Sequence, residues 1–168
     1  MDKAVTAAIL TAALGAGLLG GYVNAFSDVA NSLERVPDTM GITSMQAMID
    51  VVMENALFFL VFLGTPVLSL ILAVVAVRGI GRAGSWAILI GSMLMVVGVF
   101  GVTVGIHVPL NNSLTELDPA SAAAADLCRT FLDRWTLWNH VRAISSVGAA
   151  IAFMLALVAR VASSPSST

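Results

Sequence analysis

Four long apolar runs restrict the fold of this chain more than any other feature. They cover Ala4–Phe26, Ala56–Val77, Trp86–His107 and Asn139–Val161. A helix needs roughly 20 apolar residues to cross the hydrocarbon core of a bilayer, so each run is long enough for one span. Charged residues make up only 11% of the chain, far below the roughly 25% of a soluble domain. The sequence therefore predicts an all-α integral membrane protein built as a four-helix bundle.

The chain is expected to form one domain, with residues 1–162 as the transmembrane bundle and the Ser- and Pro-rich residues 163–168 as a disordered tail. A cleaved signal peptide is the alternative for the first run. However, Val23-Asn24-Ala25 matches a cleavage site poorly, and the run is longer than a usual signal core. The single Cys128 excludes an internal disulfide, and the net charge of −2 gives no indication of a nucleic-acid partner.

Helical structure is also expected next to the second and fourth spans. The apolar character of the second run begins at Met45, but one helix from there to Val77 would be about 50 Å long, too long for the bilayer core. The turns before Ala56 should therefore stand near the membrane interface. An apolar stripe at helical spacing before the last span predicts a surface helix there, which lies at the membrane surface or covers the end of the bundle. This stripe consists of Leu127, Phe131, Trp135 and Trp138.

Basic residues near the spans predict the orientation of the bundle. With four spans, both termini lie on one side, together with the short turn Arg78–Arg82. Each side carries four basic residues, but of the ten acidic residues only Asp2 lies on the terminal side. The short basic turn is the clearest signal under the positive-inside rule. We therefore expect both termini on the inner side of the plasma (cytoplasmic) membrane.

The third run ends in the polar segment TVGIHVPLNN at residues 103–112. In a helix, Thr103, His107 and Asn111 are four residues apart and share one face. Pro109 lacks a backbone N–H, so we expect the helix to end there. A polar stripe on the last turns of a membrane helix is energetically expensive unless it has a function.

Polar residues from three spans are expected to meet at one depth, near the outer end of the bundle. They are Asp50, Glu54, His107, Asn111, Asn139, His140 and Arg142. The two histidines and two carboxylates have the chemistry to bind copper, iron or zinc. The alternative is that all seven are ordinary polar residues of the membrane interface. Arg142 needs a counter-charge, which is either one of the carboxylates or a substrate anion.

Two segments carry motifs that hydrophobicity does not explain. HVPLNNSL occupies residues 107–114, and W-x-x-W-N-H-V-R occupies residues 135–142 at the start of the last apolar helix. Together with SMQAMI at residues 44–49 and the Phe-rich start of the second span, they resemble the anthrone oxygenase-like family of small four-helix membrane proteins. The resemblance runs from about Gly15 to Leu157. Two departures are Asp50, where we expect asparagine, and Phe26–Leu33, which lacks an expected proline.

The resemblance implies that O₂ oxidises a small organic substrate, for example an aromatic one, as when an anthrone carbon becomes a quinone carbonyl. The matched positions are His107, Pro109, Asn111, Trp138, Asn139, His140 and Arg142. The histidines would bind copper or iron, with Asp50 and Glu54 as further metal ligands, or act as acid and base. The asparagines would orient them or the substrate. A metal-free mechanism is open, because electron-rich anthrones react with O₂ once they are deprotonated.

Two further questions stay open at this point. The first is whether the chain is an enzyme or a non-enzymatic membrane protein, such as a small helical subunit or a metal-handling protein. The second is whether the glycine-rich faces of the first and third spans pack within one bundle or form a homo-oligomer, because small residues permit close approach of helices in both cases.

Overall fold

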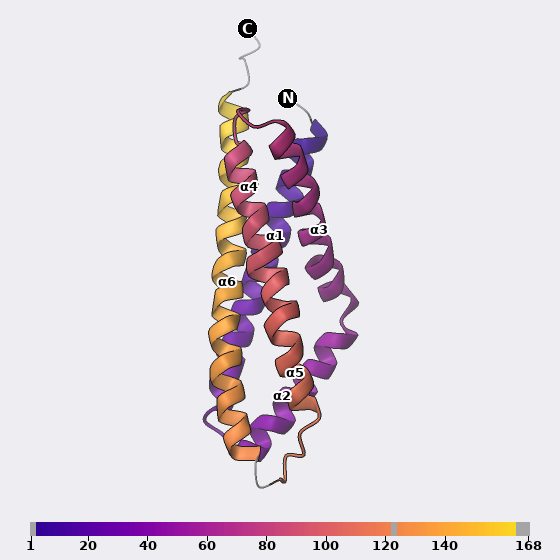
Figure 1. Ribbon diagram of the computed structural model, residues 1–168, viewed down its shortest axis with the longest axis vertical. Helices are drawn as coiled ribbons and strands as arrows, with labels where there is room; N and C mark the ends of the chain where they lie inside the picture. Colours follow the sequence, from indigo (N-terminus) through magenta and orange to yellow (C-terminus); the bar gives the residue numbers. More distant parts are fainter. Residues whose placement is uncertain (1–2, 122–123, 164–168) are drawn as a thin grey trace.

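The computed structural model describes residues 3–121 and 124–163, which form helices and connecting turns without a strand (Figure 1). The first half contains three helices, α1 (Lys3–Leu33), α2 (Asp38–Glu54) and α3 (Ala56–Arg78). The second half contains α4 (Ser85–Met93), the π-helical segments η1 (Leu94–Gly101) and η2 (Thr103–His107), α5 (Val108–Thr115) and α6 (Ala124–Ala162). The segments from α4 to α5 follow one another as one long helical rod (Figure 1).

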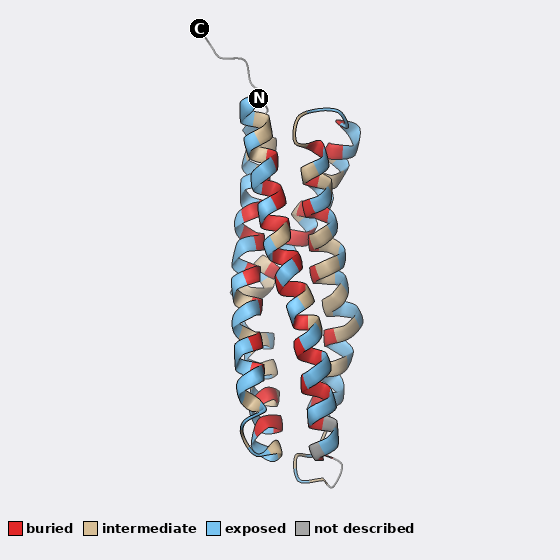
Figure 2. Ribbon diagram, turned by 90° about the vertical axis from the view of Figure 1, so that its left-hand side faces the viewer, coloured by how far each residue is buried: buried red, intermediate tan, exposed pale blue. Residues whose placement is uncertain are grey.

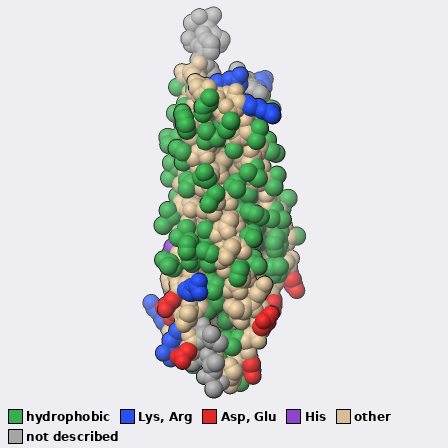
Figure 3. All heavy atoms as spheres, viewed as in Figure 1, with side chains coloured by type: hydrophobic (Ala, Val, Ile, Leu, Met, Phe, Trp, Pro, Cys, Tyr) green, Lys and Arg blue, Asp and Glu red, His purple; other side chains and the backbone are tan. Residues whose placement is uncertain are grey.

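In the described part of the chain, four stretches of helix are long and apolar enough to cross a membrane. They are Lys3–Leu33, Ala56–Arg78, Ser85–Thr115 and Cys128–Ala162. Their outer faces are apolar, and Figure 3 shows hydrophobic side chains around the middle of the molecule with charged side chains at its two ends. The predicted all-α bundle of four spans is therefore confirmed, and it fits an integral membrane protein.

Small residues at the α1–α6 contact allow these two long helices to pack closely. Ala12 and Ala16 on α1 are fully buried, as is Ala149 on α6. The Ser146 hydroxyl donates a hydrogen bond to the Ala16 carbonyl oxygen over 3.0 Å. Figure 2 shows the buried positions along the facing sides of the helices. This contact fixes the side of α6 that faces the interior, and therefore the direction of its polar residues.

The division between α2 and α3 agrees with the sequence prediction. Asn55 leaves the helical conformation, and its side-chain oxygen accepts a hydrogen bond from the Phe58 N–H over 3.0 Å. Asparagine is a favoured residue at the start of a helix because it satisfies a free backbone N–H in this way. The spanning helix therefore begins at Ala56, and α2 runs at an angle to it (Figure 1).

Two sequence predictions about helix boundaries were wrong. The expected surface helix is the first part of α6, which continues without interruption into the last span. Phe131 and Trp135 are buried against α2 and α5 there, so these two residues of the stripe pack within the bundle and not on a membrane surface. The third span does not end at Pro109, which is the second residue of α5. A proline is tolerated at that position because the change from π to α winding begins a new turn there.

The predicted tail overlaps only slightly with the described part of the chain. The helix α6 ends at Ala162, and Ser163 follows in a turn. Residues 164–168 lie outside the described residues.

Candidate active site

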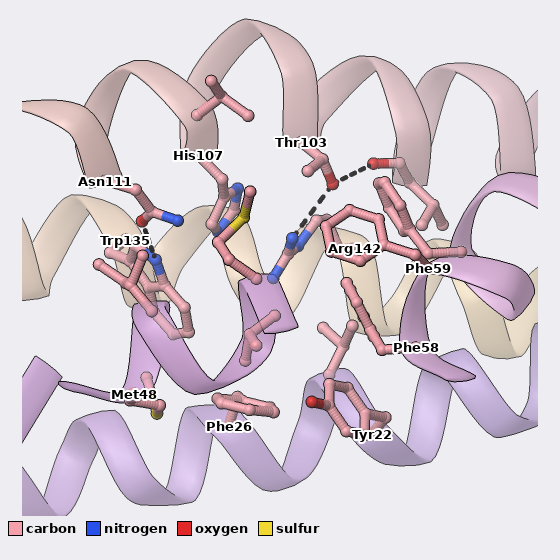
Figure 4. A pocket seen from close by; sticks show the side chains of 17 residues that line it. Tyr22, Phe26, Met48, Phe58, Phe59, Thr103, His107, Asn111, Trp135 and Arg142 are labelled. Atoms are coloured by element: carbon pink, nitrogen blue, oxygen red, sulfur yellow. Dashed lines mark hydrogen bonds between the residues drawn. The ribbon is translucent and has the colours of Figure 1, made fainter. Parts of the chain in front are cut away.

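A cavity of about 190 Å³ lies where α1, α2, α3, the third span and α6 come together. Most of its wall is apolar and aromatic. The aromatic residues are Tyr22, Phe26, Phe58, Phe59, Phe62 and Trp135. Tyr22 stacks on Phe58 with ring centroids 5.1 Å apart, and Phe58 stacks on Phe62 at 5.3 Å. The polar wall consists of Thr103, His107, Asn111 and Arg142, on one side of the cavity (Figure 4).

His107 is the buried histidine of this wall, with only 2% of its surface exposed. Its ring meets Trp135 edge-on, with centroids 5.2 Å apart and an interplanar angle of 74°. Neither ring nitrogen has a hydrogen-bond partner among the described residues. Buried polar groups in native proteins are normally hydrogen-bonded, and unpaired groups concentrate at functional sites. The imidazole of His107 therefore lines the cavity without a side-chain hydrogen-bond partner among the described residues.

Arg142 places a guanidinium group in the same wall, and only 9% of the surface of this residue is exposed. Its Nη1 donates to the Thr103 hydroxyl over 3.1 Å, and its Nη2 donates to the Asn139 side-chain oxygen. Its Nε has no partner. Within the described part of the chain, the recorded ion pair is Arg129–Asp38 at the surface, and no carboxylate pairs with Arg142. A buried cation without a counter-ion is costly, so this site is suited to an anionic ligand.

Asn139 holds Arg142 in position from the side opposite the cavity. It is fully buried, and its Nδ2 donates to the Val23 carbonyl oxygen over 2.7 Å and to the Ser27 hydroxyl over 2.8 Å. Its remaining oxygen accepts from Arg142, so the amide connects α1 to the guanidinium. Sequence analysis missed Ser27, because the first apolar run ends at Phe26 whereas α1 continues to Leu33.

Asn111 and Trp135 form the end of the cavity farthest from Phe58 and Phe59 (Figure 4). The Trp135 Nε1–H donates to the Asn111 side-chain oxygen over 3.1 Å. This bond connects α5 to α6 and fixes the indole plane against His107. Asn111 therefore connects the polar wall to the indole that contacts His107.

Comparison with known proteins places this site in a family. The sequence matches the anthrone oxygenase family over residues 58–152, from the start of α3 through most of α6. This chain belongs to the anthrone oxygenase family. The matched region contains the whole polar wall of the cavity, whereas Tyr22, Phe26 and Ser27 on α1 lie outside it. No curated protein and no solved structure matches the chain.

Three predicted site residues of this family member are exposed and do not line the cavity. His140 follows Asn139 on α6 and is exposed, because consecutive helix residues point about 100° apart and Asn139 takes the inward position. Asp50 and Glu54 lie on the exposed side of α2. Trp138, another matched position, is half-buried and does not line the cavity either. The structure therefore brings together His107, Asn111, Asn139 and Arg142, without His140 and the two carboxylates.

The donors in the cavity fit a copper or iron ion poorly. Across the described residues, no three His, Cys, Asp or Glu side chains lie close enough to hold a metal ion. The cavity offers one imidazole and the thioethers of Met48 and Met53, which are soft donors suited to Cu(I). Arg142 places a positive charge in the same wall, which opposes a second cation. The predicted metal site of His107, His140, Glu54 and Asp50 is therefore not assembled here.

Proposed function

We propose that this protein is an oxygenase that oxidises a small aromatic substrate with O₂, as in the conversion of an anthrone methylene into a quinone carbonyl. One observation carries the proposal. Among the described residues, a buried guanidinium without a carboxylate partner and a buried imidazole without a side-chain hydrogen-bond partner share the polar wall of an aromatic cavity. Membership of the anthrone oxygenase family supports the same chemistry.

His107 is the proposed general base. The methylene between two aromatic rings and opposite a carbonyl group is acidic, because the electron pair left by proton removal spreads onto the carbonyl oxygen. An imidazole without hydrogen-bond partners in a water-poor wall is available to accept that proton. Trp135 holds the ring from one side.

Arg142 is the proposed binding group for the resulting oxyanion. Charge-assisted hydrogen bonds from a guanidinium fixed in a site of low dielectric constant stabilise developing negative charge strongly. Thr103 and Asn139 hold the guanidinium in place before the substrate arrives, and its Nε remains free. The substrate anion would in turn supply the counter-charge that the protein does not provide.

The reaction balances without a further reductant. The methylene carbon loses four electrons, which O₂ accepts, so that one oxygen atom becomes the new carbonyl oxygen. The other oxygen atom leaves as water and carries the two methylene hydrogens. His107 would take the first proton from carbon and return it to oxygen, which leaves the protein unchanged. We propose a metal-free route for this chemistry, since the cavity lacks a second imidazole and a carboxylate.

Oxygen uptake and quinone formation from anthrone, measured with the purified protein in liposomes, test this proposal. His107→Ala should lower kcat by about 10²–10⁴-fold, the usual contribution of a general base. The kcat of His140→Ala should stay within about twofold of that of the unmutated protein, because His140 does not line the cavity. Elemental analysis of the unmutated protein and of His107→Ala completes the test. Copper or iron near one ion per chain, lost in His107→Ala, would contradict the metal-free route.

A non-enzymatic membrane protein is the second candidate. The exposure of His140 favours it, since the two histidines of the chain do not act on one ligand. The cavity would then bind an anionic aromatic molecule without changing it. Saturable binding of an anthrone under air, with no oxygen uptake and no quinone, would support this candidate over the oxygenase.

A further inference from the structure

The cavity is open on one side, and its rim there is apolar. Met53 at the end of α2 is 64% exposed and Val108 at the start of α5 is 44% exposed, although both line the cavity. Phe58 and Phe59, in the first turn of α3, are half-buried beside them. We call the space between Met53, Phe59 and Val108 the lateral opening.

The opening results from the way in which the helices pack. η2 packs on α6 and on its chain neighbours η1 and α5, whereas α2 packs on α1, α5 and α6. α3 packs on α1, α4 and η1. Neither α2 nor α3 therefore packs extensively on η2 within the described part of the chain. The break at Asn55 separates α2 from α3 at the same level, so no continuous helix covers this side.

The lengths of the spans place the opening at the edge of the hydrocarbon layer. From Arg78, roughly 20 residues of helix cross a core of about 30 Å and end near Phe58 and Phe59. The same count from Trp86 on the third span ends near Ile106, next to His107. An aromatic molecule with a polar group is most stable at this depth, for the same reason that Trp and Tyr gather there.

We propose that the substrate enters sideways from the bilayer, through the lateral opening, and not from water. The identity of the substrate rests on the proposed function, but the route follows from the exposed apolar rim. Such a route selects molecules that dissolve in the membrane. Their apolar rings would pass Met53 and Val108 and then meet the aromatic wall of the cavity.

Collisional quenching of Trp135 tests the route without any turnover. Trp86→Phe and Trp138→Phe leave Trp135, which lines the cavity, as the single tryptophan. In liposomes, dibromobenzene dissolved in the bilayer should quench its fluorescence at least severalfold more strongly than aqueous iodide. Val108→Phe and Met53→Phe narrow the rim at exposed positions and should each reduce quenching by dibromobenzene about threefold or more. Leu60→Phe, on the exposed face of α3, is the matched control and should leave it unchanged.

Two outcomes would overturn the proposal. One is quenching by iodide as strong as that by dibromobenzene, which indicates access from water. The other is equal quenching by dibromobenzene in the parent and in both narrowed variants. An inactive protein that still shows the expected quenching pattern would count against the oxygenase function and leave the lateral route supported.

Discussion

At the scale of single residues, Arg142 is the strongest indication that the cavity binds an anion. Its partners are a hydroxyl and an amide, which fix its position but do not neutralise it. Replacing a buried charge by an apolar side chain of similar volume is often neutral or stabilising. A role in stability and a role in binding therefore predict different results for one substitution.

Arg142→Met should lower kcat with anthrone by about 10²–10³-fold, the usual effect of removing an oxyanion-binding group. The thermal unfolding temperature should fall little, because removal of an uncompensated charge from the interior offsets the loss of the hydrogen bond to the Asn139 side-chain oxygen. Arg142→Lys keeps the charge but loses the two-nitrogen contact, and should be intermediate in activity. Oxygen uptake and circular dichroism measure the two properties. An unfolding temperature that falls while kcat is kept would assign Arg142 a structural role.

Asn139 and Ser27 should be energetically coupled, because the amide satisfies the Ser27 hydroxyl and the Arg142 guanidinium together. Asn139→Leu should lower the free energy of unfolding by about 1–3 kcal/mol for each buried group left unpaired. Ser27→Ala alone should lower the free energy of unfolding by less than Asn139→Leu does. In a protein that already carries Asn139→Leu, Ser27→Ala should hardly change the free energy of unfolding. A double-mutant cycle in mixed micelles measures this coupling, with exposed His140→Leu as the control. Additive effects of the two substitutions would contradict it.

The sequence predicts the part of this site that lies on the third span, because helical spacing determines which of its residues share a face. Helical spacing alone places His107 and Asn111 on one face of the third span, and both line the cavity. Spacing does not determine which face of α6 turns inward, because Asn139 and His140 are both polar and adjacent. The close approach of α1 decides it, through Ser146 and Ala16, and that contact depends on the packing of two helices far apart in sequence.

At the scale of helices, the glycines of the third span show which small residues determine packing. A Cβ atom at Gly98 would lie 2.6 Å from the Ser145 Cβ on α6, whereas at Gly105 it would meet nothing within 4 Å. Gly101 and Gly105, the pair that fits the small-xxx-small pattern, therefore do not form this contact. The sequence predicts a glycine-rich face on this span, but the π-helical winding of η1 and η2 decides the direction in which that face points.

Gly98→Ala should therefore destabilise the bundle by about 1–3 kcal/mol, since α6 must shift to admit the methyl group. Gly105→Ala, on the same span, is the matched control and should be neutral or slightly stabilising, because alanine restricts the unfolded chain more than glycine. Unfolding of both variants in mixed micelles, followed by circular dichroism, compares them. Equal stability of the two variants would mean that the third span and α6 pack differently from the arrangement described here.

The α2–α3 boundary was predictable from sequence, but the ends of the third and fourth spans were not. The length of the bilayer core requires a break near Ala56, and Asn55 supplies the local cap. At Pro109 and before Asn139, however, local rules suggested boundaries that tertiary packing removes. Apolar contacts of Phe131 and Trp135 with α2 and α5 continue the bundle beyond the bilayer-spanning length.

At the scale of the whole molecule, the charges are distributed unequally between the two ends. α1 begins and α6 ends at the same end of the bundle, which also carries the α3–α4 turn (Figure 1). The basic residues Lys3, Arg78 and Arg82 belong to this end, whereas the acidic residues from Asp28 onward belong to the other. From the positive-inside rule we predict that the cavity, which lies toward the acidic end, is near the outer surface of the membrane.

Labelling of single cysteines in intact cells tests this orientation. With Cys128→Ser as the background, Glu116→Cys reports on the exposed α5–α6 connection and Ser163→Cys on the end of α6. A maleimide that cannot cross membranes should label Glu116→Cys in intact cells, and Ser163→Cys only after the cells are opened. The reverse pattern would place the acidic end inside. The lateral opening would then lie near the inner leaflet, and a substrate made in the cytoplasm would reach it without crossing the bilayer.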